Sequence, residues 1–197
     1  AGHAVMAVAE QQFAQVLAER RATGLAGQQQ RQVVALAVVT HQAVVRSQRV
    51  RECRQQRRFR GEADYAVMHE IIAGSKSEDQ SEWTTSVEDI ARNYRHLVNC
   101  DPYQDMFFAE MHSRAVGYSR VWWAEGKKGK LLYSHFAFLV PEWRVSGIRH
   151  AMLCFNEQRL RTIGAAHKAA GDAVAGQFLE AWAWDRETQW DRLLRDE

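Results

Sequence analysis

Three consecutive segments of the chain have the pattern of β-strands. Residues 105–111, 115–125 and 130–140 are rich in aromatic and β-branched residues, which favour the pleated backbone of a sheet. Residues 112–114 form a short connection between the first two segments, and the Gly-Lys-Lys-Gly sequence at 126–129 connects the second to the third. Because connections this short join neighbouring antiparallel strands, the pattern predicts an antiparallel meander.

Apolar residues recur at helical spacing on both sides of this meander. The segment after Gly147 has one apolar face that can cover the sheet, formed by Ile148, Ala151, Met152, Phe155, Ile163 and Ala166. The other predicted elements are a strand at 57–60, helices at 62–75 and 87–97, a strand at 178–184 and the start of a helix at 188–196. The resulting order, β-α-α-β-β-β-α-β-α, predicts a mixed α/β fold.

The first 55 residues differ in composition from the rest of the chain. Ala, Val, Gln and Arg dominate there, and Trp, Tyr, Pro and Lys are absent. Strong helix formers predict a helix at 4–22, and a second helix is expected at about 28–54, although its apolar residues are mostly β-branched. We therefore divide the chain into a helical or poorly ordered extension, 1–55, and a folded domain, 56–197.

Charge is distributed unevenly along the chain. The first 60 residues contain ten arginines and three glutamates, a formal net charge of +7, whereas the whole chain carries +2. An arginine-rich arm can bind the phosphates of nucleic acid, but runs of like charge are more often solvated. We expect a solvated appendage, and nucleic-acid or partner binding by residues 1–60 is the alternative.

The composition as a whole limits the class of protein. With 197 residues, 46% of them hydrophobic, the chain is long enough for one domain with a buried core. Cys53, Cys100 and Cys154 are far apart in sequence and show no metal-ligand spacing, so we expect a reduced cytoplasmic protein without a metal. No apolar stretch approaches the roughly 20 residues of a membrane span, and no Walker loop or nucleophile elbow is present.

The most informative junction lies between the third strand of the meander and the helix after Gly147. A buried strand ends near Val140, a short loop follows, and the helix begins directly after the glycine. Backbone N–H groups at a helix start carry partial positive charge and bind phosphate when the preceding loop lets the ligand approach. Gly147 has no side chain to block that approach, so the junction predicts an anion site.

This junction resembles the acyl-CoA pyrophosphate loop of the GNAT superfamily of N-acetyltransferases. The family pattern, Arg/Gln-x-x-Gly-x-Gly/Ala, lies at the same strand-to-helix corner. Arg144 and Gly147 match the pattern, whereas Arg149 stands at the second small position and Val145 stands where a glycine is frequent.

The rest of the domain is consistent with this resemblance. The predicted element order is that of the GNAT fold, and the sequences at 100–105, 117–120 and 178–182 resemble those of bacterial members related to the mycothiol-synthase type. The resemblance covers residues 56–197. In that fold two more strands follow the last helix, so we expect a truncated copy of the sheet whose open edge favours a homodimer.

The resemblance implies transfer of an acetyl group from acetyl-CoA directly to the primary amine of a small molecule. The expected acetyl-CoA contacts are the main chain of Phe138, Leu139 and Val140 and the residues Arg144, Val145, Ser146, Gly147, Ile148, Arg149 and His150. Arg149 either crowds the phosphates or swings out and pairs with them. Fixed main-chain donors would stabilise the oxyanion that forms on the thioester carbonyl.

Direct transfer also requires a group that removes a proton from the amine. His135 and Glu110 are the candidates, although His135 could instead face solvent or satisfy a buried hydrogen bond. The family's usual acid, a tyrosine on the last helix, is replaced by Leu194, and Tyr133 is a distant substitute. The alternative function is therefore a truncated, non-catalytic GNAT-like domain that binds acyl-CoA weakly or not at all.

Overall fold

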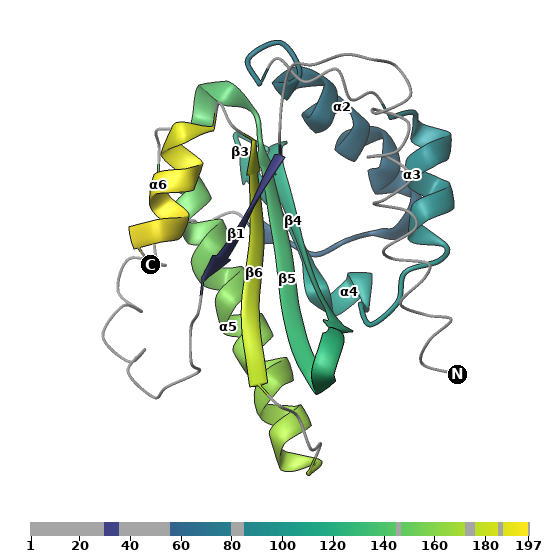
Figure 1. Ribbon diagram of the computed structural model, residues 1–197. Coiled ribbons are helices and arrows are strands. Elements are labelled where there is room, and N and C mark those ends of the chain that lie inside the picture. The colour runs from purple at the N-terminus through teal and green to yellow at the C-terminus, as the bar shows by residue number, and fades with distance from the viewer. Residues whose placement is uncertain are drawn as a thin grey trace, which may run out of the picture.

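A six-stranded sheet forms the centre of the protein (Figure 1). The computed structural model describes residues 30–35, 56–79, 85–144, 147–171, 176–184 and 187–196. The strands lie in the order β1-β6-β5-β4-β3-β2. Their bounds are β1 Gln30–Ala35, β2 Gln56–Arg57, β3 Met106–Met111, β4 Arg114–Glu125, β5 Lys130–Leu139 and β6 Gly176–Trp184.

Helices cover both faces of the sheet. Figure 1 shows α2 and α3 on one side of it and α5 and α6 on the other. The helix bounds are α2 Tyr65–Ser75, α3 Val87–Tyr94, α4 Pro102–Asp105, α5 Ile148–Ala169 and α6 Thr188–Asp196, with short 3-10 helices at Gly61–Asp64, Lys127–Gly129 and Pro141–Trp143. The mixed α/β fold expected from the sequence is confirmed, with β1 and α4 as additional elements.

The predicted meander is present. β3, β4 and β5 are antiparallel neighbours, and the register places Tyr118 of β4 between Phe108 of β3 and Phe138 of β5. The turn between β3 and β4 contains His112 and Ser113, both in the left-handed conformation with φ of 50° and 64°. A turn this short leaves the two strands no alternative to antiparallel pairing.

The helices before the meander begin close to where the sequence predicts. The Ser86 hydroxyl accepts a hydrogen bond from Asp89 N at 3.1 Å, and the Asp89 carboxylate accepts one from Ser86 N at 3.1 Å. This reciprocal cap satisfies two backbone donors and fixes the start of α3. The helix ends at Tyr94, three residues earlier than expected, and the opening strand is limited to Gln56 and Arg57.

Two hydrophobic clusters lie on the two faces of the sheet. Phe107 and Phe108 are successive residues of β3, so their side chains point to opposite faces. Phe107 belongs to the cluster that α5 and α6 cover, with Leu139, Met152, Leu153 and Trp190. Phe108 belongs to the cluster that α2 and α3 cover, with Met68, Ile71, Ile90, Met106 and Tyr118. The sheet is therefore buried on both sides, and the packing of the helix after Gly147 on it is confirmed.

β5 and β6 pair in parallel over only part of their length. The pairs run from Lys130 and Gly176 to His135 and Ala181. β5 then continues to Leu139, and the described residues form no β5–β6 pair beyond that point. The two strands therefore diverge at the end where β5 leads into the loop before α5.

The helix predicted at 28–54 is wrong where the structure describes that segment. Residues 30–35 form β1 rather than part of a helix at 28–54, because Val33 and Val34 are β-branched and favour a strand. The remainder of that predicted helix and the helix predicted at 4–22 lie outside the described residues.

β1 also changes the expected edge of the sheet. It pairs antiparallel with β6, with Gln30 opposite Trp184 and Ala35 opposite Leu179. The β6 edge that we expected to lie open is therefore paired within the chain itself. The homodimer and the domain boundary near residue 55 remain predictions.

Gly117 of β4 lies against the end of β5, and this contact gives a testable prediction. A Cβ added at Gly117 would lie 2.7 Å from Phe138 O and 2.9 Å from Leu139 Cδ1. Because a main-chain oxygen cannot move aside without displacing the strand, Gly117→Ala is expected to lower the free energy of unfolding by about 1–3 kcal/mol. Urea denaturation measures this change.

Gly74→Ala is the matched control for this substitution. Gly74 is an exposed residue of α2, and a Cβ there would make an ordinary contact of 3.5 Å with Val140 Cγ1. Alanine is the better helix former, so the free energy of unfolding is expected to rise by about 0.5–1 kcal/mol. A stabilised Gly117→Ala variant would contradict the close approach of β4 to β5.

Candidate functional site

The loop between β5 and α5 contains the glycine on which the anion-site prediction depends. Gly147 has φ of 78° and ψ of −5° and immediately precedes Ile148, the first residue of α5. This left-handed backbone is costly for a residue with a Cβ, which explains the glycine. The first N–H groups of α5 have no acceptor within the helix. Val145 and Ser146, two of the predicted contacts, lie outside the described residues.

A pocket of about 350 Å³ lies between the start of α5 and α6. It is lined by Arg144, Gly147, Arg149, His150, Gln189, Trp190 and Leu193. The first four of these are predicted acetyl-CoA contacts, so the structure brings them together. The start of α5 therefore faces a pocket, as an anion site requires.

The other predicted contacts do not line this pocket. Ile148 is buried in the cluster beneath α5 and α6. Phe138 packs on the opposite face of the sheet, where its ring centroid lies 5.4 Å from that of Tyr118. Val140 N donates to Val116 O at 2.9 Å, so this amide is already used within the sheet.

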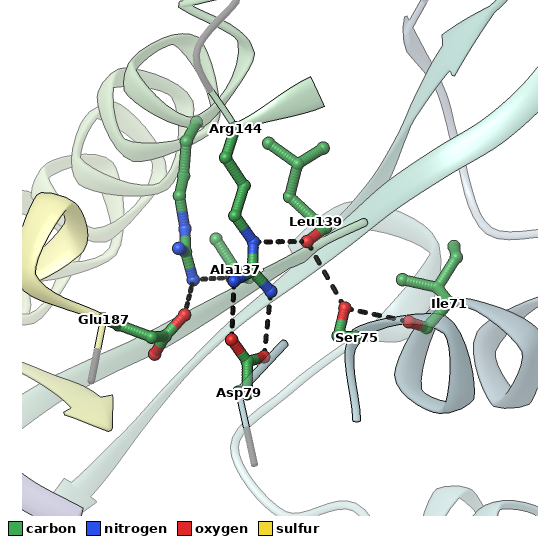
Figure 2. Close-up of polar contacts among 8 residues, drawn as sticks. Ile71, Ser75, Asp79, Ala137, Leu139, Arg144 and Glu187 are labelled. Carbon is green, nitrogen blue, oxygen red and sulfur yellow. Dashed lines mark hydrogen bonds and ion pairs between the residues drawn. The ribbon is translucent and has the colours of Figure 1, made fainter. Parts of the chain in front are cut away.

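Arg144 is held at the end of β5 by a bidentate ion pair. Its Nη1 and Nη2 donate to the two carboxylate oxygens of Asp79 at 2.5 and 2.8 Å, and its Nε donates to Leu139 O at 3.1 Å (Figure 2). The Ser75 hydroxyl donates to the same carbonyl at 3.4 Å. Arg144 thus connects the end of β5 to the segment after α2.

Arg149 is paired within the chain. Its side chain is buried, with 7% of the residue exposed, and it lines the pocket. Both expectations for its behaviour toward a bound phosphate remain predictions. The Nη2 atom donates to a Glu187 carboxylate oxygen and, at 3.2 Å, to Ala137 O. The guanidinium carbon also lies 4.6 Å from the centroid of the Trp190 ring. Arg149 therefore occupies the space where β5 and β6 diverge.

These ion pairs determine the charge of the site. Arg144 is paired with Asp79 and Arg149 with Glu187, so the two cations are matched by two carboxylates. Burial lowers the pKa of Arg149, and the charge of Glu187 counteracts that effect. An anion bound here would rely on the amides of α5, or would take guanidinium donors from the carboxylates.

Neither predicted base lies at the pocket. His135 is fully buried, its Nδ1 lies 3.3 Å from Asn156 Nδ2, and its ring is perpendicular to that of Trp190 at a centroid distance of 6.1 Å. Burial lowers the pKa of His135 to about 4, so the ring is neutral. One ring nitrogen of His135 thus has a buried hydrogen-bond partner, whereas its Nε2 is buried without one.

Glu110 is also committed to another contact. Its carboxylate accepts a hydrogen bond from Arg57 Nε at 2.6 Å on the β2–β3 side of the sheet. Leu194, at the position of the family acid, is buried in the core beneath α5 and α6. The Tyr133 hydroxyl lies 2.9 Å from His167 Nδ1 and accepts from Gln177 Nε2 at 3.1 Å, away from the residues that line the pocket.

Three residues of the site were missed by the sequence interpretation. Asp79 and Glu187 pair with arginines that are far from them in sequence, and no spacing rule connects such partners. Trp190 could have been found, because the helical period of α6 places it on one face with the buried Leu194. An arginine in a loop that is expected to be buried indicates that a carboxylate partner lies nearby, but it does not identify that partner.

The described residues show two further absences. None of their helices combines the length and the apolar character that crossing a membrane requires. They also contain no group of three or more histidine, cysteine or acidic side chains arranged to hold a metal ion.

Comparison with known proteins yields structural neighbours only. No protein-family model and no curated protein matches the chain. A GCN5-related N-acetyltransferase from Sphaerobacter thermophilus is similar in structure, with 19% identity and a TM-score of 0.46 over 56% of this chain. This chain spans 33% of the length of that protein.

Two other solved structures give a similar result. An aminoglycoside acetyltransferase from an uncultured soil metagenomic sample has 13% identity and a TM-score of 0.47, covering 72% of this chain and 84% of that one. An acetyltransferase from Vibrio fischeri has 19% identity and a TM-score of 0.40, covering 66% and 99%. The neighbours are acetyltransferases by name. At this level of similarity, statements about activity rest on the residues of the site.

Removal of Glu187 tests the buried ion pair. Glu187→Ala leaves the Arg149 guanidinium buried without a carboxylate, so the free energy of unfolding is expected to fall by about 3–5 kcal/mol. Replacing both partners, as in Arg149→Leu with Glu187→Leu, is expected to recover most of that loss, because no charge is then left unpaired. Urea denaturation of the single and double variants measures both effects.

Arg195→Ala is the control for this experiment. It breaks an ion pair with Asp191 on α6 that is exposed to solvent, and exposed pairs contribute little. A Glu187→Ala variant as stable as Arg195→Ala would show that Arg149 is not held by Glu187.

The buried His135 ring predicts a specific pH dependence of stability. The pKa of His135 is about 4 in the folded protein, against an ordinary value of about 6.5 in the unfolded chain. Between these values the unfolded chain binds a proton that the folded protein does not, so stability falls as the pH is lowered from about 6.5 to about 4. His135→Gln is expected to flatten this part of the profile in urea denaturation. An unchanged slope in the variant would assign the pH dependence to other groups.

Proposed function

We propose that the chain is an N-acetyltransferase that moves the acetyl group of acetyl-CoA directly to the primary amine of a small molecule. The pocket of about 350 Å³ between the start of α5 and α6 is the observation that supports this most. A diphosphate held there would accept hydrogen bonds from the first amides of α5 and would be stabilised by the helix dipole. The left-handed Gly147 lets the ligand approach those amides.

Binding of the cofactor requires Arg149 to change partners. Arg149 donates to Glu187 and to Ala137 O in the space where β5 and β6 diverge, which is where an extended acyl arm would pair with β5. Phosphate and carboxylate oxygens accept the same guanidinium donors. In our proposal the pyrophosphate therefore replaces Glu187 as the partner of Arg149, and the carbonyl of Ala137 becomes available to the arm.

The chemistry then depends on main-chain groups of β5. Val140 N already donates to Val116 O, and the antiparallel register points Phe138 N toward β4 in the same way. The proposed donor to the thioester carbonyl is therefore the N–H of Leu139. A fixed amide stabilises the developing oxyanion without reorganisation. Water is the proposed acceptor of the amine proton, because neither His135 nor Glu110 lines the pocket. A positioned base typically contributes roughly 10²–10⁴-fold, so turnover is expected to be slow.

A non-catalytic domain is the second candidate function. It is favoured by the same Arg149 contacts, since an ion pair that stays in the divergence between β5 and β6 would keep the acyl arm out. In that case the chain binds acyl-CoA weakly or not at all. Direct titration separates the two candidates.

Isothermal titration of the full chain with acetyl-CoA is the central test. We expect a dissociation constant in the micromolar range, followed by thiol release when a primary amine is added. Gly147→Ala places a Cβ on a left-handed residue at the proposed phosphate site, so its affinity for acetyl-CoA is expected to fall at least tenfold.

Gly171→Ala is the matched control, because Gly171 also has φ of 78° and open space around it but lies at the far end of α5. Its affinity for acetyl-CoA is expected to equal that of the unaltered chain. Absence of binding at millimolar acetyl-CoA would reject the enzyme and favour the non-catalytic domain. Equal losses in the two glycine variants would place the pyrophosphate elsewhere.

A further inference from the structure

Arg120 of β4 is a half-buried cation without a carboxylate partner among the described residues. Its Nη1 donates to Asn93 Oδ1 at 3.3 Å, and its Nε is buried with no hydrogen-bond partner. The guanidinium carbon lies 5.1, 5.3 and 5.2 Å from the ring centroids of Tyr94, Trp122 and Phe136. Aromatic rings stabilise the charge but accept few of the five N–H donors of an arginine.

A second unsatisfied group lies beside it. The hydroxyl of Tyr94, whose ring contacts Arg120, is also buried and has no hydrogen-bond partner. Burial raises the pKa of Tyr94 to about 12, although the charge and hydrogen bonding of the nearby Arg120 counteract that effect, so the hydroxyl keeps its proton and remains a donor. Buried polar atoms without partners are rare in folded proteins. Two of them next to each other, both donors, indicate a site suited to an oxyanion.

The neighbouring acidic side chains are used elsewhere. Asp105 accepts hydrogen bonds from Arg159 Nε and from Asp101 N, both at 2.7 Å. Asp101 caps α4 by accepting from Tyr103 N at 3.0 Å. Burial raises the pKa of Cys100 to about 12, so its thiol is neutral. No anion of the described chain is therefore available to Arg120.

The position of Arg120 relates this cluster to the proposed transfer site. Arg120 is paired in register with Phe136, the first β5 residue past the last β5–β6 pair. Two residues further along the strand, a distance of about 7 Å, is Phe138, which immediately precedes the proposed thioester contact Leu139. The cluster lies on the face covered by α2 and α3, opposite the α5–α6 pocket.

We propose that Tyr94, Arg120, Trp122 and Phe136, the Arg120 cluster, bind the carboxylate of an amine acceptor whose apolar part contacts the rings. The acceptor class would be an amine that also carries a carboxylate, such as an aromatic amino acid. Arg120 and Tyr94 would donate to the carboxylate oxygens, and the amine would point toward β5 past Phe136. The acceptor role rests on the proposed acetyl transfer, whereas carboxylate binding does not.

The test compares an acid with an alcohol of the same shape, in the absence of acetyl-CoA. The full chain is titrated calorimetrically with 3-phenylpropanoate and with 3-phenylpropanol. We expect the unaltered chain to bind the acid at least tenfold more tightly than the alcohol. Arg120→Gln is expected to abolish this difference in affinity, and Arg120→Lys is expected to keep part of it. Tyr94→Phe is expected to reduce the difference severalfold. Arg92→Gln, which removes an exposed arginine one residue before Asn93, is expected to leave both affinities unchanged.

Two results would overturn the inference. One is equal affinity of the unaltered chain for the acid and the alcohol, and the other is a preference for the acid that Arg120→Gln or Tyr94→Phe leaves intact. If Arg120→Gln does not fold, the inference is still tested by Tyr94→Phe and by the relative affinity of the unaltered chain for the acid and the alcohol. Acid binding without acetyl-CoA binding would reject the transferase and retain the carboxylate site. Acetyl-CoA binding without acid preference would reject the carboxylate site alone.

Discussion

The separation of β5 from β6 after His135 and Ala181 is the constraint on which the site depends. A backbone carbonyl that loses its strand neighbour and stays buried must find another donor. Ala137 O receives Arg149, and Leu139 O receives Arg144 and the Ser75 hydroxyl. Each of the two arginines thus satisfies a carbonyl at the end of β5. The loop with its left-handed glycine then leads from this strand end into α5.

The two arginines create a second requirement, because buried cations need counter-charges. Asp79 supplies one from the segment after α2, and Glu187 supplies the other from the residue before α6. The end of β5 is consequently tied to two other parts of the chain by ion pairs. A ligand anion that competes for either arginine would also loosen the attachment of α2 or α6, so binding and local order are coupled at this site.

The elements that sequence alone predicts are those with a local cause. The meander follows from short turns between aromatic strands, and the start of α3 follows from Ser86 and Asp89, which are three residues apart. The short loop with Gly147 between a strand and a helix is also predicted, whereas the left-handed backbone of Gly147 is a property of the structure. By contrast, the pairing of Arg149 with Glu187 and the burial of His135 arise from tertiary packing, and neither spacing nor composition contains that information. The residues around Arg120 come from α3, β4 and β5, so their proximity cannot be predicted before the fold is known.

The pairing of β1 with β6 has a consequence for how the sheet forms during synthesis. Gln30 faces Trp184, so β1 can complete its pairing with β6 only after residues 36–184 have been synthesised. At about 5–20 residues per second, that delay is roughly 8–30 s. Contacts between residues so far apart in sequence are entropically costly to close and slow to form. β1 is therefore expected to dock on β6 after the meander, whose strands are close in sequence, has assembled.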